Sequence, residues 1–408
     1  MEKKYLFVIA AMVVCAVAIF GAGCTTTGTG NQEDYVATVD VIQIGAGMQI
    51  NSLSLGQIDG MINWQPNVSA ATVSGIGKVV SYSQNLPRSD NGTWAEHTCC
   101  VFGANKTGVE NKDLATVLTY LMLVANKYIT DDPANAAKYV ADWMYGDTPL
   151  EYGGKTLTGV QILTDSLPTI KFNTEASENW LSSNYEFLEI QRSLGAISGN
   201  LKSTSKEDTE KIIYNFTAYN TAKSIVNGTA TLPTPVSDGI SIGYLLSDHD
   251  APLFVLVKNW EYFRDNCNAY LKPESTASGL VEKAELYVNG KKICNVSFEK
   301  AEGGPALMTL LQSDKLQYAV AGTPPYLSSI DIQTGLKILS PIMTEGSALV
   351  VSANAPANNW EEFVNWAIKR SAEGKNVTIA IPQKNSIQDV QLKSALESAK
   401  IKYQTLEV

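Results

Sequence analysis

One short stretch, residues 303–325, predicts a helix and a buried strand in close succession. This spacing is compatible with few fold classes. It begins with the diglycine turn Gly303-Gly304 and continues with apolar residues at helical spacing between 307 and 311. A largely apolar strand segment follows at 316–321, and a Gly-Thr-Pro-Pro stretch at 322–325 that we expect to be a loop. A helix and a buried strand joined this closely are typical of α/β proteins with parallel sheets.

The same order of elements occurs again near the N-terminus, where residues 52–66 can be laid over 310–324. Two units of one design predict two similar α/β lobes that face each other. The alternative is that any two amphipathic helix–strand pairs look alike. Free backbone N–H groups at Gly304 and Ala306, at the start of the later helix, would face an anionic or polar ligand.

The length of 408 residues fits two domains and a connection. The stretch 146–228 is polar and predicted to be helical, and the Pro-containing stretch 229–239 is the clearest linker. A net charge of −10 argues against nucleic-acid binding, since tracking phosphates requires a basic surface.

Residues 1–24 resemble a lipoprotein export signal. Lys3 and Lys4 precede an uncharged apolar run, and small residues lead to Cys24, which would be lipidated. The alternative is an uncleaved membrane anchor, because the run is near the length that spans a bilayer. Residues 25–35 would then be a flexible tether, and both alternatives place the rest of the chain outside the cytoplasm.

Other features suit an exported glycoprotein. Asn-X-Ser/Thr acceptors occur at seven positions: Asn67, Asn91, Asn105, Asn215, Asn227, Asn295 and Asn376. Cys267 and Cys294 flank a predicted helix-to-strand connection and are candidates for a disulfide. The adjacent Cys99 and Cys100 are interpreted as buried strand residues.

Several short motifs together carry a resemblance to a known family. They are Ile242-Gly243-Tyr244, Ser247-Asp248-His249-Asp250-Ala251-Pro252-Leu253, Gly303-Gly304-Pro305-Ala306-Leu307-Met308, Gly322-Thr323-Pro324-Pro325, Thr344-Glu345-Gly346-Ser347, Ser386-Ile387-Gln388-Asp389, Gly56-Gln57-Ile58-Asp59 and Trp64-Gln65-Pro66. This combination resembles the extracytoplasmic solute-binding proteins of ABC importers, in the nitrate/sulfonate/taurine and thiamine-pyrimidine group. The resemblance covers most of residues 36–145 and 240–408.

The order of the motifs differs from that of the family, in which the unit starting at Ile240 comes first. The resemblance therefore implies a two-lobed α/β clamshell of the type II periplasmic-binding-protein kind, circularly permuted and with extra helices. Lobe I would be 240–376, the main part of lobe II 36–145, and the start of lobe II 377–408, which must pack beside 36–66. Close chain ends make such a permutation tolerable. The alternative is a spliced or truncated gene product.

Solute capture requires polar groups on the ends of rigid elements in both lobes. The candidates from lobe I are Ser247, Asp248, His249, Gly304, Thr323, Glu345 and Ser347. Those from lobe II are Ser386, Gln388, Met48, Asp59, Trp64 and Gln65. Some have structural interpretations too, for example Ser247 and Ser386 as helix caps and Trp64 as a core residue.

The resemblance implies a monomer that performs no chemistry, uses no metal or cofactor, and delivers its solute to an ABC permease and its ATPase. The scarcity of arginine means that an oxyanion would be held mainly by backbone amides and hydroxyls, whereas the acidic candidates suit an amine or aminopyrimidine. Two alternatives remain open. One is a surface sensor or adhesin ectodomain with the same fold, and the other is a thiamine-pyrimidine synthase-like enzyme that uses His97, Cys99 and Cys100 with His249.

Overall fold

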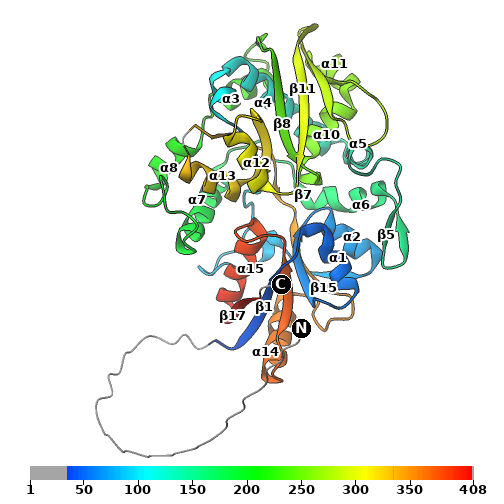
Figure 1. The fold of residues 1–408 in the computed structure, drawn as a ribbon, viewed down its shortest axis with the longest axis vertical. Helices are drawn as coiled ribbons and strands as arrows, with labels where there is room; N and C mark the ends of the chain where they lie inside the picture. The colour runs from blue at the N-terminus through cyan, green and yellow to red at the C-terminus, as the bar shows by residue number, and fades with distance from the viewer. Residues whose placement is uncertain (1–34, 334, 407–408) are drawn as a thin grey trace, which may run out of the picture. The chain divides into compact units, whose positions relative to one another are not determined.

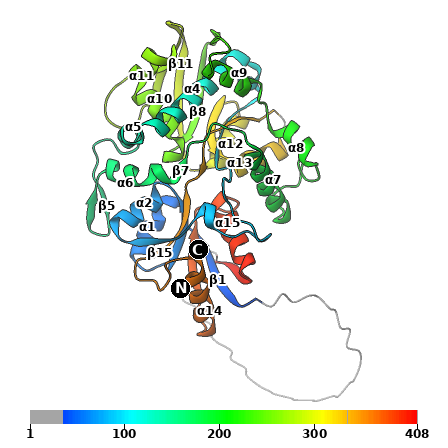
Figure 2. The same ribbon diagram turned by 180° about the vertical axis from the view of Figure 1, so that it is seen from behind.

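Two β-sheets, each packed against helices, organise the part of the chain that the computed structural model describes, residues 35–333 and 335–406. Figure 1 and Figure 2 show the two groups of strands from opposite sides. The predicted export signal with Cys24, and nearly all of the predicted tether, lie outside the described residues. No helix within the described ranges combines the length and apolar character needed to cross a bilayer.

The six-stranded sheet joins the two ends of the described chain. Its order is β17 (Ile401–Leu406), β1 (Ala37–Gln43), β16 (Val377–Ile381), β2 (Gly60–Trp64), β15 (Ser347–Ser352) and β3 (Gly77–Tyr82). β1 pairs in parallel with β16 on one edge and with β17 on the other, and β16 also pairs in parallel with β2. The segment after residue 376 therefore lies beside the N-terminal strands, as both views show.

The seven-stranded sheet has the order β13 (Lys337–Pro341), β4 (Cys100–Ala104), β12 (Tyr318–Gly322), β8 (Gly239–Leu245), β11 (Lys291–Ala301), β10 (Lys283–Val288) and β9 (Ala269–Pro273). Its centre is parallel, because β8 pairs in this sense with both β11 and β12. Burial of β12 from Tyr318 to Ala321 explains the apolar run seen in the sequence, since central parallel strands are covered on both faces.

Each sheet contains one strand that enters directly after the chain crosses from the other sheet. β4 follows β3 and pairs antiparallel with β12 and β13. β15 follows β13, apart from the two-residue β14 (Thr344–Glu345), and pairs antiparallel with β2 and β3. The two sheets thus exchange a strand, which is why the domain boundaries drawn from the sequence do not coincide with them.

The two sheets divide the chain differently from the predicted lobes at two places. Lobe II was predicted to extend through residue 145, yet β4 belongs to the seven-stranded sheet. Lobe I was predicted to extend through residue 376, yet β15 belongs to the six-stranded sheet and α14 (Trp360–Ala372) packs on β1. In both cases the chain passes from one sheet to the other without a linker-like sequence, so the sequence gives no signal for a boundary there.

Helices cover the sheets in two groups. α1 (Ala46–Ser54), α2 (Asn67–Ser74), α14 and α15 (Ile387–Ser398) contact the six-stranded sheet. Most of the others lie with the seven-stranded sheet: α3 (Lys106–Glu110), α4 (Lys112–Asp131), α5 (Pro133–Tyr145), α9 (Thr217–Val226), α10 (Ala251–Lys258), α11 (Trp260–Cys267), α12 (Gly304–Gln312) and α13 (Thr323–Ile332). The Gly-Thr-Pro-Pro stretch expected to be a loop is the first turn of α13, where proline is tolerated because that turn needs no N–H donor.

The segment 146–228 bridges the two groups. It contains the hairpin β5 (Leu150–Tyr152) and β6 (Lys155–Leu157), then α6 (Gly159–Ser166), β7 (Ile170–Lys171), α7 (Glu178–Ser193), α8 (Lys206–Ile213) and α9. α6 contacts both α2 and α5, and α7 contacts both α13 and α15. The following stretch has no regular structure from Leu232 to Ser237 and is held by side chains such as Asn111, which donates to the Val236 carbonyl.

The disulfide predicted between Cys267 and Cys294 is not formed, and both thiols are free. Cys294 lies on β11 opposite Leu286 of β10, and β10 separates it from β9, which follows Cys267. Strands two apart are separated by about 10 Å, beyond the Cα separation of about 7 Å that a disulfide tolerates.

One predicted glycosylation acceptor is also excluded by its environment. Asn105 is buried and caps α3, with its side-chain oxygen accepting from the Gly108 N–H. Its Nδ2 donates to the Leu316 carbonyl at 2.8 Å, so this amide nitrogen is inaccessible to a glycan.

The packing of the C-terminal strands against β2 can be tested at Gly60. A Cβ there would lie 2.8 Å from both the Val350 carbonyl oxygen and Ile379 Cδ1. Because backbone cannot easily yield, we expect Gly60→Ala to lower the free energy of unfolding by about 1–3 kcal/mol in urea titrations. The control is Gly47→Ala in α1, where nothing lies within 4 Å, and it should be neutral or stabilising by up to about 1 kcal/mol. Equal effects would contradict this packing.

Candidate functional site

A cavity of about 430 Å³ lies where the carboxyl ends of strands from both sheets meet. Trp64 ends β2, Leu245 ends β8 and Gly322 ends β12, while the loop 383–385 follows β16. The complete lining is Trp64, Cys99, Cys100, Leu245, Ser247, His249, Gly303, Gly304, Pro305, Met308, Thr309, Gln312, Gly322, Pro325, Ser328, Ser329, Ile332, Gln383, Lys384, Asn385, Ser386, Ile387 and Gln388. The carboxyl end of a parallel sheet is the usual place for a ligand in α/β proteins.

Three helices begin at this cavity. Gly303 to Pro305 start α12, Gly322 precedes α13, and Ser386 to Gln388 start α15. Helix N-termini present backbone N–H groups and a partial positive charge. Lys384 adds a charged side chain, and no Asp or Glu occurs among the described residues that line the cavity.

The turn after β8 ties the two sheets together beside the cavity. Ser247 Oγ donates to the Gln65 carbonyl at 2.8 Å, and Ser166 Oγ donates to the Asp248 carboxylate. His249 Nε2 lies 2.9 Å from the Gly346 carbonyl. A Cβ on Gly346 would lie 2.7 Å from His249 Nε2, and φ is +79° there, so glycine is required for this approach.

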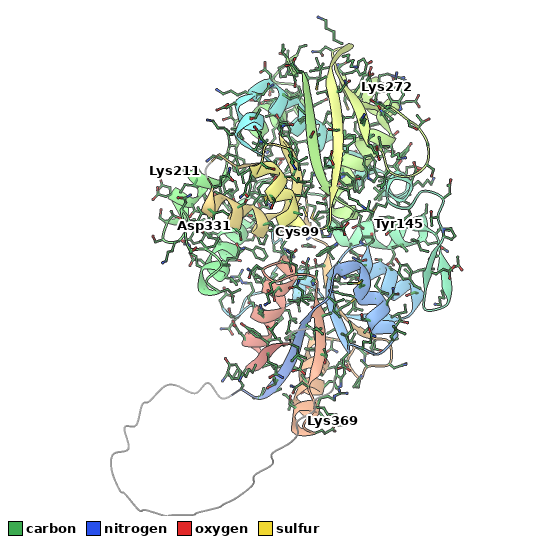
Figure 3. The ribbon with its side chains drawn as sticks, viewed as in Figure 1. Cys99, Tyr145, Lys211, Lys272, Asp331 and Lys369 are labelled. Atoms are coloured by element: carbon green, nitrogen blue, oxygen red, sulfur yellow. The ribbon has the colours of Figure 1, made fainter. Side chains whose placement is uncertain are left out.

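Two cysteines meet His249 in the wall of the cavity. His249 Nδ1 lies 3.5 Å from Cys99 Sγ and 3.8 Å from Cys100 Sγ, and all three residues are buried. Cys99 precedes β4 and Cys100 begins it, so the pair stands at a strand end. Figure 3 labels Cys99 in the region between α12 and α15, the two helices whose first turns line the same cavity.

The charges of these three groups depend on one another. The hydrogen bond from Cys100 holds the pKa of the Cys99 thiol well below its usual value against the effect of burial, and His249 adds to this shift. The same hydrogen bond and burial raise the pKa of Cys100. Burial lowers the pKa of His249, but Cys99 and Asp248 outweigh it and raise the pKa to about 9. Cys99 and His249 therefore each favour the charged form of the other.

His97, the other histidine, takes no part in this cluster. Its ring nitrogens lie 2.8 Å from the Thr98 carbonyl and 2.9 Å from Ser83 Oγ. The ring also packs edge-on against Trp94 and Phe187. Of the four residues grouped for the enzyme alternative, Cys99, Cys100 and His249 lie together, whereas the His97 ring nitrogens bond other groups.

Six of the thirteen predicted ligand residues line the cavity: Trp64, Ser247, His249, Gly304, Ser386 and Gln388. A seventh, Ser347, supports one of them, since Gln388 Nε2 donates to Ser347 Oγ at 2.8 Å. Gln388 and Ser347 are both buried, so this bond fixes the amide at the start of α15.

The remaining six do not line the cavity. Met48 is 62% exposed on α1, and Asp59 accepts from the Thr378 N–H and pairs with Arg370. Gln65 bonds Thr169 and the Ser69 N–H, and Thr323 bonds Thr98. Asp248 is buried against Ser166, and Glu345 pairs with Lys171. Met48 therefore faces solvent, and the other five side chains hold elements together instead of facing the cavity.

Several lining residues were not among the predicted candidates. The cysteines were assigned to a buried strand, and they lie 150 and 149 residues from His249 in sequence. Lys384, Gln383 and Asn385 sit in the loop before α15, next to the predicted Ser386. Their position directly after a buried strand was the sequence signal that pointed to this loop.

Comparison with known proteins gives two matches. Residues 31–144 match the model of the NMT1-like family. A stretch of 125 residues, 30% of this chain, is 34% identical to 80% of the uncharacterized protein MJ1180 of Methanocaldococcus jannaschii. No solved structure matches.

The role of Glu345 as a structural residue can be tested at its partner. Its side chain is 3% exposed, and Lys171 Nζ lies 3.0 Å from Oε1. Among the described residues, Lys171→Met would leave this buried carboxylate with the Glu96 N–H at 3.4 Å as its remaining side-chain partner, so we expect a loss of about 1–2 kcal/mol of unfolding free energy. Lys127→Met, which breaks an exposed helical pair with Asp131, should change stability by no more than about 0.5 kcal/mol. Denaturant unfolding measures both variants, and similar losses would argue against the assignment.

Proposed function

We propose that this chain is an extracytoplasmic solute-binding protein, because residues 31–144 match the model of the NMT1-like family, which is generally a family of binding proteins. Its cavity would capture a small organic anion and deliver it to an ABC permease and its ATPase. The observation that carries this proposal is the cavity itself. The helices α12, α13 and α15 begin at it with their backbone N–H groups, and they belong to the helix groups of both sheets.

The strand exchange supports a two-lobed clamshell of the type II kind. Each lobe would be one sheet with its helices, and the crossings at β3–β4 and β13–β15 would form the hinge. The pairing of β1 with β16 and β17 supports a circularly permuted order, since strands from opposite ends of the chain complete one sheet. The chain would be tethered to the outer face of the membrane and act as a monomer.

An anion suits the cavity better than an amine does. Lys384 supplies positive charge, and the helix N-termini supply donors. The acidic side chains that would favour an amine are engaged elsewhere, Asp59 with Arg370 and Glu345 with Lys171. Trp64, Met308 and Ile332 offer apolar contact, so the anion would carry an organic part, as a sulfonate or carboxylate does.

A thermal-shift screen of the full chain tests this proposal. The panel contains organic sulfonates, carboxylates, nitrate, aminopyrimidines and simple amines. We expect an organic anion to raise the melting temperature, with about 2.7 kcal/mol of stabilisation at a hundredfold excess over its dissociation constant. Lys384→Met and Gln388→Ala should weaken binding at least tenfold, because they remove charge and a polar group from the cavity.

Met48→Ala serves as the matched control, because this side chain is exposed on α1 away from the cavity. It should leave the response to the anion unchanged. Stabilisation by amines alone would overturn the choice of ligand class. A panel without any response would remove the support for solute capture, and binding without an associated permease would favour the sensor or adhesin alternative.

A further inference from the structure

The donor atoms of Cys99, Cys100 and His249 all lie within 4.8 Å of one another. Each residue offers one atom, and the three line the cavity. Two sulfurs and one imidazole nitrogen are a ligand set that favours zinc and other thiophilic cations over magnesium or calcium, which take oxygen ligands. Unlike a lone cysteine, this set converges from two strand ends, of β4 and β8, that are separated in sequence.

The separations match tetrahedral coordination. With Zn–S of about 2.3 Å and Zn–N of about 2.0–2.1 Å, tetrahedral angles place sulfur and nitrogen ligands about 3.6 Å apart. Here His249 Nδ1 is 3.5 Å from Cys99 Sγ and 3.8 Å from Cys100 Sγ. The two sulfurs lie within 4.8 Å of each other, so an ion placed between the three atoms can approach all of them once the side chains adjust.

The surroundings of His249 also suit a metal ligand. Its other nitrogen, Nε2, lies 2.9 Å from the Gly346 carbonyl, which accepts only from a protonated nitrogen. This bond leaves Nδ1 as the coordinating atom once the imidazole is neutral. Metal-bound histidines commonly donate their second N–H to a carbonyl or carboxylate in this way, which fixes the orientation of the ring.

Two buried carboxyl groups lie beside the proposed ligands. Asp248 and Asp250 flank His249 in the chain, and both are fully buried. One oxygen of each carboxyl group, Oδ1, has no hydrogen-bond partner among the described residues. Buried polar atoms without a partner are uncommon, and these two belong to the residues on either side of the imidazole.

We propose that Cys99, Cys100 and His249 form a binding site for a thiophilic divalent cation, with Zn²⁺ as the best match. The three residues supply three ligands, and the fourth position faces the cavity. Water or a donor atom of a bound solute fills that position. The solute ligand rests on the proposed function, whereas the water ligand does not. Zn²⁺ binds when both sulfurs and His249 Nδ1 carry no proton, so any proton that they hold is released to solvent on binding.

Cobalt is the probe for this site, since tetrahedral Co²⁺ bound by thiolates has intense visible absorption and a near-ultraviolet sulfur-to-cobalt band. The full chain is reduced, stripped with a chelator and titrated with Co²⁺, and then with Zn²⁺ in competition. We expect one equivalent of Co²⁺ to give both features and Zn²⁺ to abolish them. Cys99→Ser, Cys100→Ser and His249→Ala should each weaken binding by more than the roughly 10–100-fold that loss of an outer hydrogen bond costs.

Cys267→Ser and Cys294→Ser are the matched controls, because these free thiols lie outside the cavity and should leave the spectrum unchanged. A measurement on the unaltered protein avoids misfolded variants: Zn²⁺ should protect Cys99 and Cys100 from alkylation but not Cys267. The site would be overturned if the sulfur-to-cobalt band did not appear, or if it survived in the Cys99 and Cys100 variants. It would also be overturned if Zn²⁺ left the alkylation of Cys99 and Cys100 unchanged. Metal loading needs no solute, so failure here and failure of the anion screen are separate results.

Discussion

The hydrogen bonds on both edges of β1 are the interaction on which the rest of the structure depends. β16 and β17 come from the end of the described chain, yet they enclose the first described strand in parallel register from Val39 to Ile42. Because β16 also pairs with β2, this contact places the loop after β16 and the start of α15 next to Trp64. Without this pairing, the cavity would lose the part of its lining that the loop 383–385 and the start of α15 provide.

The exchange of β4 and β15 between the sheets has a chemical effect as well as a topological one. β4 brings two cysteines to the end of a sheet in which β8 delivers His249, while β15 begins beside Gly346, whose carbonyl meets the imidazole. The cluster therefore sits at the junction of both sheets. Polar contacts there, such as Ser247 with the Gln65 carbonyl, join the strand ends directly.

Much of the element order could be predicted from the sequence, because alternating apolar runs and caps are local signals. Asp132 before Pro133 caps α5, and the Asn289-Gly290 turn joins β10 to β11. The site was harder, because whether a polar side chain faces a cavity or a neighbouring element depends on distant partners. Asp59 meets Arg370, and Glu345 meets Lys171. The sequence grouped Cys99 and Cys100 with both histidines, but only the fold shows that His249 is the one whose ring nitrogen lies beside the sulfurs.

Helices α6 and α7 touch elements of both sheets, in addition to the two direct crossings of the chain. If the two sheets move apart, the connection formed by α6 and α7 must bend or detach. Either change costs packing against α2, α5, α13 or α15. For the proposed solute, this connection would slow the opening and closing of the site. The residence time of a complex would then reflect the stiffness of residues 146–228 as much as the affinity of the walls.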